Sequence, residues 1–279
     1  MSTGSIPPIC ATCGTQYASQ RPDCPICLDE RQYVPLDGQR WTDLERVRAE
    51  HSAVIREQGP GVLGIGCTPR FAIGQRALLL RTPDGNVLWD CVAHLDDEIV
   101  RAVGALGGIA AIAISHPHYY TTLVEWSRAF DAPVHLHARD RQWVGRPDPA
   151  LHFWEGTSAP LLGGLLLINL GVHFAGGTVL HWQRGWGTGG EPSPGDRGAL
   201  FSGDVVQVIP DRAHVGFMYS YPNLIPERPA VVRRAAELLE PLPFDALYGA
   251  WWDAVIRTGA HEAVRRSARR YLDFVRDDA

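Results

Sequence analysis

The sequence contains no lysine, so all 26 of its basic side chains are arginines. Schiff-base catalysis and the phosphate-binding P-loop both need a lysine amine, and the absence excludes both kinds of site. Positive charge is also scarce, because 31 acidic side chains give the chain a formal net charge of -5. Since phosphate binding relies on clustered positive charge, we do not expect a nucleic acid as a partner.

Long apolar runs are missing as well. The longest, LLGGLLLINLG at 161–171, is far shorter than the roughly 20 residues of a membrane-spanning helix. The first ten residues, MSTGSIPPIC, lack the basic start and the apolar segment of a secretory signal. We therefore expect a cytoplasmic protein without a membrane partner. In that reducing compartment the six cysteines are expected as thiols or metal ligands and not as disulfides.

Four cysteines form two Cys-x-x-Cys pairs separated by ten residues: Cys10, Cys13, Cys24 and Cys27. Four thiolates at this spacing can bind a structural zinc tetrahedrally, and the zinc can hold together a segment too short to build a core. Two disulfides or a redox pair are the alternatives. The pairs also resemble those of rubredoxin, which would place iron here, but the short spacer favours a zinc ribbon. Its balanced charge suits a lid, a docking surface or a homodimer contact.

The chain divides into a ribbon at 1–40, a linking helix at 41–60 and a main domain at 61–279. Thr42-Asp-Leu-Glu45 has the form of a capping box, and apolar residues then recur at helical spacing up to the Gly-Pro-Gly at 59–61. This pattern predicts that one helix connects the ribbon to the main domain.

The main domain alternates short apolar runs with helical patterns. The runs are typical of buried strands, and the helical patterns lie near 96–106, 120–130, 226–240 and 258–275. The alternation indicates an α/β (α+β) fold whose sheets are covered on their outer faces by helices. The segment GWGTGGEPSPGDRG at 185–198 is expected to be a loop between two strands.

Polar side chains follow three of the apolar runs directly. His116 and His118 follow IAAIAIS, His173 follows LLLINLGV, and Asp204 follows GALFSG. Loops that leave the same edge of a sheet can converge on one site. Three neutral imidazoles with an open fourth position form a catalytic zinc set, which Asp204 could complete or orient.

At these residues the main domain resembles the metallo-β-lactamase-fold hydrolase superfamily. His116-Pro-His118 is similar to the start of its His-x-His-x-Asp-His motif, and His173 precedes a glycine and a strand as the third histidine of the family does. Asp204 ends a strand, like the metal-bridging aspartate, and Asp90 resembles an early aspartate that supports the site. The resemblance implies an αββα sandwich with the metal at one edge.

The usual ligands of a second metal are absent. The aspartate and histidine that finish the family motif are replaced by Tyr120 and Thr121, whose hydroxyls are neutral near pH 7. The family's last histidine is also missing, because the corresponding stretch reads Tyr-Gly-Ala-Trp-Trp-Asp at 248–253. The sequence therefore predicts a site with one metal.

A metal-dependent hydrolase of a small molecule is the leading hypothesis. Zinc on the three histidines would lower the pKa of a bound water from 15.7 to about 7. Asp204 would orient that water or accept its proton, and Tyr120 is a candidate donor to the leaving atom. A single metal suits an ester, thioester, lactone or amide better than a phosphodiester. The substrate pocket is expected to include Tyr119, Tyr219, Tyr221 and Trp252.

Two alternatives stay open. Two of the histidines with Asp204 would match the two-histidine, one-carboxylate set of non-haem Fe(II) enzymes, and the superfamily includes persulfide dioxygenases. Iron would then replace zinc at the main site. The other alternative is a non-catalytic, metal-stabilised binding protein, because the loss of half the usual ligands is also what decay of an activity would produce.

Overall fold

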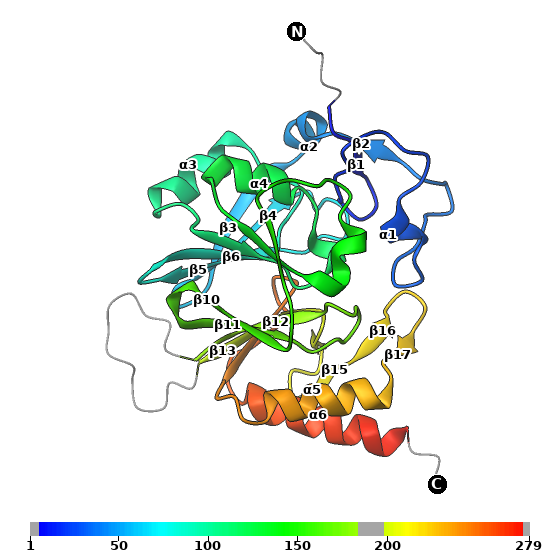
Figure 1. The fold of residues 1–279 in the computed structure, drawn as a ribbon, viewed down its shortest axis with the longest axis vertical. Helices are drawn as coiled ribbons and strands as arrows, with labels where there is room; N and C mark the ends of the chain where they lie inside the picture. The colour runs from blue at the N-terminus through cyan, green and yellow to red at the C-terminus, as the bar shows by residue number, and fades with distance from the viewer. Residues whose placement is uncertain (1–5, 184–197, 276–279) are drawn as a thin grey trace.

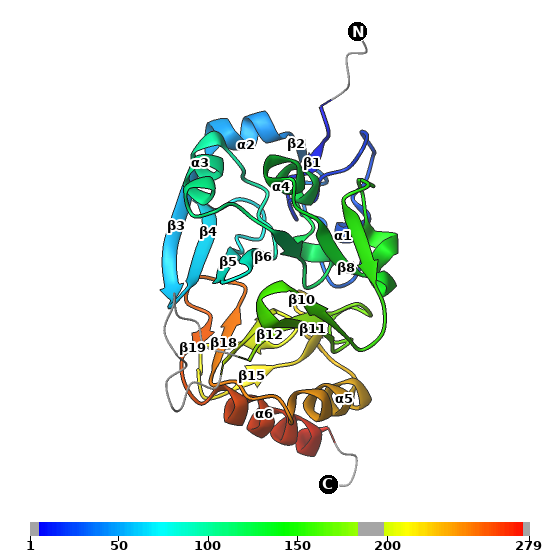
Figure 2. The same cartoon turned by 60° about the vertical axis from the view of Figure 1, so that its left-hand side comes forward.

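The computed structural model describes residues 6–183 and 198–275, and these form a sandwich of two large sheets with helices on both outer faces (Figure 1). Helices α3 (Asp97–Ala105) and α4 (Leu123–Phe130) cover the first sheet. Helices α5 (Pro229–Leu239) and α6 (Ala260–Phe274) cover the second, as the turned view also shows (Figure 2). The predicted αββα architecture is confirmed. The loop predicted at 185–198 lies, except for Gly198, outside the described residues.

The first sheet has the strand order β3-β4-β5-β6-β7-β8-β9. Its strands are β3 (Ser52–Gly59), β4 (Val62–Thr68), β5 (Ala77–Thr82), β6 (Gly85–Trp89), β7 (Ala111–Ala113), β8 (Val134–His137) and β9 (Leu151–Trp154). Strands β3 to β6 pair antiparallel, whereas β6 to β9 pair parallel, so the chain crosses over through α3 and α4. The parallel strands therefore end at one edge of the sheet, and the loops that follow them meet there.

The second sheet has the strand order β10-β11-β12-β13-β18-β19. Its strands are β10 (Ser158–Leu161), β11 (Leu165–Asn169), β12 (Thr178–Trp182), β13 (Ala199–Gly203), β18 (Ala246–Gly249) and β19 (Val255–Ile256). Two short hairpins follow β13, namely β14 (Gln207–Val208) with β15 (Val215–Gly216), and β16 (Met218–Ser220) with β17 (Ile225–Pro226), all within the described residues. Single 3-10 turns lie at η1 (Pro117–Tyr119), η2 (Ala138–Trp143) and η3 (Leu162–Gly164).

Successive side chains of a strand point to opposite faces of its sheet and so pack into different apolar layers. In β5, Leu78 and Leu80 pack between the sheets, whereas Leu79 packs under α3 and α4. Leu167 and Phe201 reach the inter-sheet layer from the second sheet. Each fully buried side chain of this kind contributes about 1.5–3 kcal/mol relative to an exposed one, so the sandwich is a stable frame for the loops at its edge.

The linking helix is shorter than predicted. Helix α2 covers only Leu44–Glu50, and its N-cap is Asp43, whose side chain accepts a hydrogen bond from the Arg46 N–H. Residues 52–59 are strand β3, which pairs with β4 along its length. The prediction that one helix runs to Gly59 was therefore wrong. Because Val54 and Ile55 are β-branched, they suit a half-buried strand, and the pairing with β4 decides the outcome.

The ribbon lies beside the sandwich. It consists of β1 (Ile9–Cys10), α1 (Pro25–Leu28) and β2 (Trp41–Thr42), with β1 and β2 paired antiparallel. Figure 1 shows the ribbon in dark blue, near the β16-β17 hairpin. Of the helices in the described part of the chain, not one combines the length and the apolar character that crossing a membrane requires.

Candidate metal centre

Loops from both sheets carry the predicted histidines and aspartate to one edge of the sandwich. The turn η1 follows β7. His116 directly precedes this turn, and His118 lies within it. His173 lies between β11 and β12, and Asp204 directly follows β13. The Thr178 N–H donates a hydrogen bond to the Ser115 carbonyl at 2.9 Å, and this bond ties the loops of the two sheets together.

The four side chains converge. One ligand atom from each of His116, His118, His173 and Asp204 lies within 4.8 Å of the others. His118 Nδ1 is 3.2 Å from His173 Nε2, and His116 Nε2 is 3.2 Å from Asp204 Oδ1. Their exposed fractions lie between 1% and 5%. His116 Nε2 and Asp204 Oδ1 are buried without a hydrogen-bond partner among the described residues, so the set fits a shared cation.

Neighbouring groups fix the orientation of His173. Its Nδ1 lies 2.8 Å from the Tyr219 carbonyl oxygen, which can only accept, so Nδ1 carries the proton and Nε2 offers its lone pair to the cluster. The backbone of His173 has φ +66°, a conformation that costs a non-glycine residue about 1–3 kcal/mol. The buried Glu227 carboxylate holds it there by accepting from the His173 N–H at 2.8 Å. No local sequence pattern indicated a role for Glu227.

Asp90 supports the other side of the cluster. The strands β6 and β7 are parallel neighbours, and Asp90 Oδ1 accepts a hydrogen bond from the Ser115 N–H at 2.7 Å. Ser115 Oγ is in turn 2.9 Å from His116 Nδ1. This chain of contacts directs His116 Nε2 toward Asp204.

Burial also sets the charge state of the cluster. It lowers the pKa of His116, His118 and His173 and raises the pKa of Asp204. The imidazoles are therefore neutral at pH 7, which is the form that binds a metal.

Comparisons with known proteins show which family the chain belongs to. No family model matches the chain. The chain is 45% identical over 269 residues to the uncharacterized protein YmaE of Bacillus subtilis (strain 168), with 95% of each chain covered. It belongs to the same family as YmaE.

Solved structures of metallo-β-lactamases are similar to the chain over most of its length. The Rm3 metallo-β-lactamase has a TM-score of 0.53 and 20% identity, covering 82% of this chain and 95% of its own. MEM-A1, a subclass B3 metallo-β-lactamase from a soil metagenome library, has a TM-score of 0.53 and 16% identity, covering 78% of this chain and 94% of its own. The protein thus has the metallo-β-lactamase fold.

The four ribbon cysteines form a second cluster, which is consistent with a zinc ribbon. The Sγ atoms of Cys10 and Cys27 are 3.6 Å apart, as are those of Cys13 and Cys24. A disulfide needs about 2.05 Å, and all the described cysteines are free. The Gln39 amide donates to Cys10 Sγ at 3.2 Å, an interaction that stabilises a thiolate. Among the residues that the structure describes, these two clusters are the only convergent groups of this kind.

The two tyrosines after His118 have different surroundings. Tyr119 is buried with its ring centroid 4.5 Å from that of His116, and its hydroxyl lies next to the Asp204 carboxylate. Burial and the charge of Asp204 raise the pKa of Tyr119. The Tyr120 hydroxyl instead donates to the Asp140 carbonyl at 3.4 Å. The geometry therefore favours Tyr119 over Tyr120 as the hydroxyl next to the cluster.

The ribbon contacts the cluster directly, through residues that the sequence did not single out. Arg31 donates to the His173 carbonyl oxygen at 3.2 Å, and its guanidinium carbon lies 3.9 Å from the Phe174 ring centroid. Tyr219, whose carbonyl orients His173, donates its hydroxyl to Glu30 Oε1 at 2.7 Å. The ribbon thus braces the loops that hold His173.

Of the four residues predicted to line a substrate pocket, Tyr119 lies beside the cluster. Tyr221 also lies beside the cluster, because its hydroxyl donates to the Asp204 carbonyl at 2.7 Å and its ring centroid is 5.3 Å from that of His173. Tyr219 contacts the ribbon, whereas Trp252 lines a separate cavity. A substrate role for these residues stays a prediction.

Asp140 lies under the His173 loop. Its Oδ1 accepts from the Gly176 N–H at 2.9 Å, and its Oδ2 is buried without a partner among the described residues. Burial raises the pKa of Asp140 from 3.8 to about 6. The stability that this carboxyl contributes is therefore fully present below pH 3.8 and is lost as the pH rises through about 6.

We expect Asp140→Asn to stabilise the protein at neutral pH, because the amide keeps an acceptor for Gly176 without a buried charge. The free energy of unfolding should rise by on the order of 2 kcal/mol at about pH 7.5, and the gain should shrink by roughly half at about pH 5. Urea unfolding of the variant and of the unmodified protein at the two pH values measures this difference in free energy of unfolding. An equal gain at both pH values would contradict the buried charge of Asp140 as its cause.

Proposed function

We propose that this protein is a metal-dependent hydrolase that uses one metal ion at the sheet edge. The convergence of three neutral imidazoles and a carboxylate within 4.8 Å, on a metallo-β-lactamase fold, carries the proposal. His116, His118 and His173 would hold the ion with Asp204. Tyr120 and Thr121 stand where the superfamily has ligands for a second ion, and they offer only neutral hydroxyls. We infer zinc as the metal, and a small ester, thioester, lactone or amide as the substrate.

A bound zinc would supply a Lewis acid and a water with a pKa near 7. The protein groups would do the rest. Asp204 would accept a proton and keep its carboxylate fixed through the loop that Tyr221 holds. Tyr119, whose hydroxyl lies next to the Asp204 carboxylate, would donate a hydrogen bond to the leaving atom. Its raised pKa keeps that hydroxyl protonated at pH 7.

Substrate entry requires movement of the ribbon. The metal-binding side chains are at most 5% exposed, and Arg31 covers Phe174 next to them. We infer that Glu30 and Arg31 separate from the His173 loop to admit substrate, and that their return excludes water.

The same burial favours a second candidate, a non-catalytic protein in which both metals only stabilise the fold. A structural site is closed to solvent, whereas a catalytic site keeps a position open. The two candidates differ in what a broad substrate screen finds when both metals are present.

We expect the purified protein to contain nearly two metals per chain and to hydrolyse at least one class in a panel of p-nitrophenyl esters, thioesters, lactones and amides. Asp204→Asn should lower the rate about 100-fold or more, because it removes the group that accepts the proton. The matched control is Asp211→Asn, since Asp211 is an exposed aspartate paired with His214. Full metal content without any hydrolysis would support the second candidate. Iron at the histidine cluster would direct the search to redox chemistry instead.

A further inference from the structure

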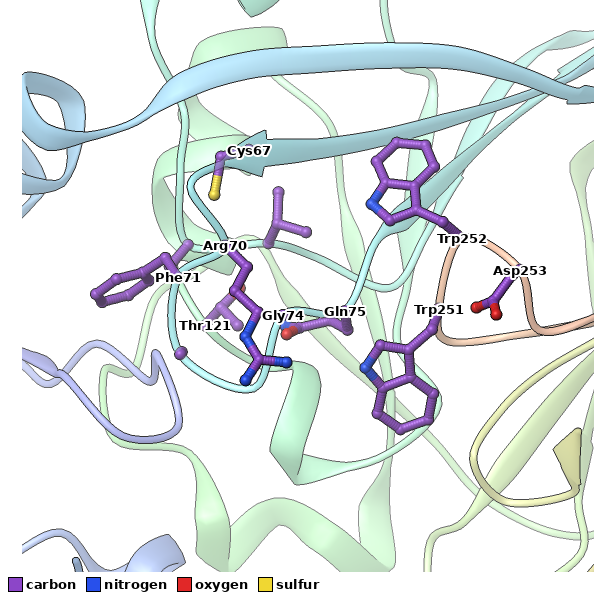
Figure 3. Close-up of a pocket in the computed structure, with 12 residues that line it drawn as sticks. Cys67, Arg70, Phe71, Gly74, Gln75, Thr121, Trp251, Trp252 and Asp253 are labelled. Carbon is purple, nitrogen blue, oxygen red and sulfur yellow. The ribbon is translucent and has the colours of Figure 1, made fainter. Parts of the chain in front are cut away.

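A cavity of about 240 Å³ is lined by no residue of either metal cluster. It is lined by parts of 67–75, by Val92 and Ala93, by Thr121 and by the loop 251–253 (Figure 3). The sequence departs from the second-metal ligands of the superfamily at Tyr120, at Thr121 and in the stretch 248–253, and this cavity is lined by Thr121 and by the loop 251–253 but not by Tyr120.

The aromatic wall of the cavity is held in place by its neighbours. The Trp252 ring packs against β4 where a Cβ at Gly64 would lie 2.7 Å from it and a Cβ at Gly66 would lie 2.9 Å from it. Both positions must therefore be glycine for the indole to sit there. The Trp251 indole N–H donates to the Ile73 carbonyl at 3.4 Å. Figure 3 shows the two indoles on one side of the cavity and Phe71 on the other. The wall is thus preorganised for a flat ring.

Arg70, an exposed arginine, borders the cavity between these walls. Arg70 forms no ion pair or hydrogen bond with the described residues, and its side chain extends into the cavity (Figure 3). Its stem lies against Gly74, where a Cβ would be only 3.0 Å from Arg70 Cδ. The Asp253 carboxylate at the rim is 3.6 Å from Arg212, so it already has a cationic partner. Arg70 is therefore available to an anion from outside.

Thr121 supplies a buried polar group. It is 3% exposed, and its hydroxyl has no hydrogen-bond partner in the described part of the chain. Its backbone has φ +35°, which is rare for a β-branched residue. The hydroxyl oxygen has almost no exposed surface, so Thr121 forms part of the cavity wall and does not offer this oxygen to a ligand.

We propose that this cavity binds a small aromatic carboxylate. The planar guanidinium of Arg70 matches a carboxylate in two parallel hydrogen bonds, and the indoles pack against the ring. The volume lies below the roughly 300–1,000 Å³ of pockets for drug-sized ligands, so the site suits a ligand with one ring.

Ligand-observed ¹⁹F NMR with 4-fluorobenzoate and the metal-loaded protein tests the proposal. We expect a dissociation constant of roughly 1 mM or below for this ligand, and binding at least about ten-fold weaker for the neutral 4-fluorobenzyl alcohol. Arg70→Gln should weaken 4-fluorobenzoate binding about ten-fold. Arg101→Gln, at an exposed arginine of α3, should leave it unchanged.

The histidine cluster needs its own control, because a carboxylate can also bind a metal. Binding of 4-fluorobenzoate should persist in His118→Ala, which removes a candidate ligand but no residue of the cavity wall. Loss of binding in that variant would assign the ligand to the metal. No binding to the unmodified protein, or equal binding by Arg70→Gln, would also overturn the proposal.

Discussion

Cys27→Ser is expected to remove the ribbon zinc and to weaken metal binding at the distant histidine cluster as well. The apparent binding energy of a four-thiolate zinc is of the order of 10 kcal/mol, so the ribbon should unfold first. Arg31 and Glu30 would then leave the His173 carbonyl and the Tyr219 hydroxyl. We expect total metal to fall from nearly two per chain to one or less, with about ten-fold weaker affinity at the remaining site.

Cys67→Ser is the matched control, because Cys67 is half-buried and lies in neither metal cluster. Its metal content should equal that of the unmodified protein. Elemental analysis of both variants, followed by zinc titration with a chromophoric chelator, measures the two effects. Full metal content in Cys27→Ser would refute the zinc ribbon. Loss of the ribbon zinc with unchanged affinity at the second site would refute only the coupling.

His118→Ala is expected to abolish metal binding at the sheet edge and to leave the ribbon zinc in place. Removing one imidazole breaks the set of four converging atoms, and we expect affinity at that site to fall by more than about 100-fold, beyond the effect of losing a supporting group. The fold should survive, because the apolar layers of the sandwich do not include the cluster.

The chain provides a matched control in His135→Ala. His135 also belongs to a His-x-His pair, but it lies in β8 and stacks on His152 at 5.9 Å. It belongs to no metal cluster among the described residues. One metal per chain in His118→Ala and two in His135→Ala would support the assignment, whereas two in both would contradict it.

The convergence of the cluster could be predicted because its residues directly follow buried strands, and the order of such strands fixes where their loops meet. The choice between Tyr119 and Tyr120 could not be predicted. They are adjacent in a tight turn, and only the turn geometry decides which ring contacts His116. Strand β3 was missed because its apolar spacing also suits a helix, and only its pairing with β4 distinguishes the two.

Contacts between distant segments left no trace in the local pattern. Arg31 and His173 are separated by 142 residues. In the sequence, Arg31 is one of several arginines of the ribbon whose positive charge is balanced by acidic residues of the same segment. The cavity at Thr121 was equally hidden, because its walls come from four separate segments. The absence of the second-metal ligands was visible in the sequence. The cavity at these positions could not be predicted, because its shape depends on the packing of Trp252 against Gly64 and Gly66.

The contact between ribbon and sandwich bears on how relatives of this protein can diverge. The Arg31 guanidinium carbon lies 3.9 Å from the Phe174 ring centroid and 5.4 Å from those of Trp143 and Tyr219. A change at any one of these positions alters the surface on which the others rest. Substitutions there should therefore occur together across homologues, and the ribbon should not be inherited as an interchangeable module. If the ribbon were grafted onto another protein with the metallo-β-lactamase fold, the three aromatic residues that contact Arg31 would have to be transferred with it.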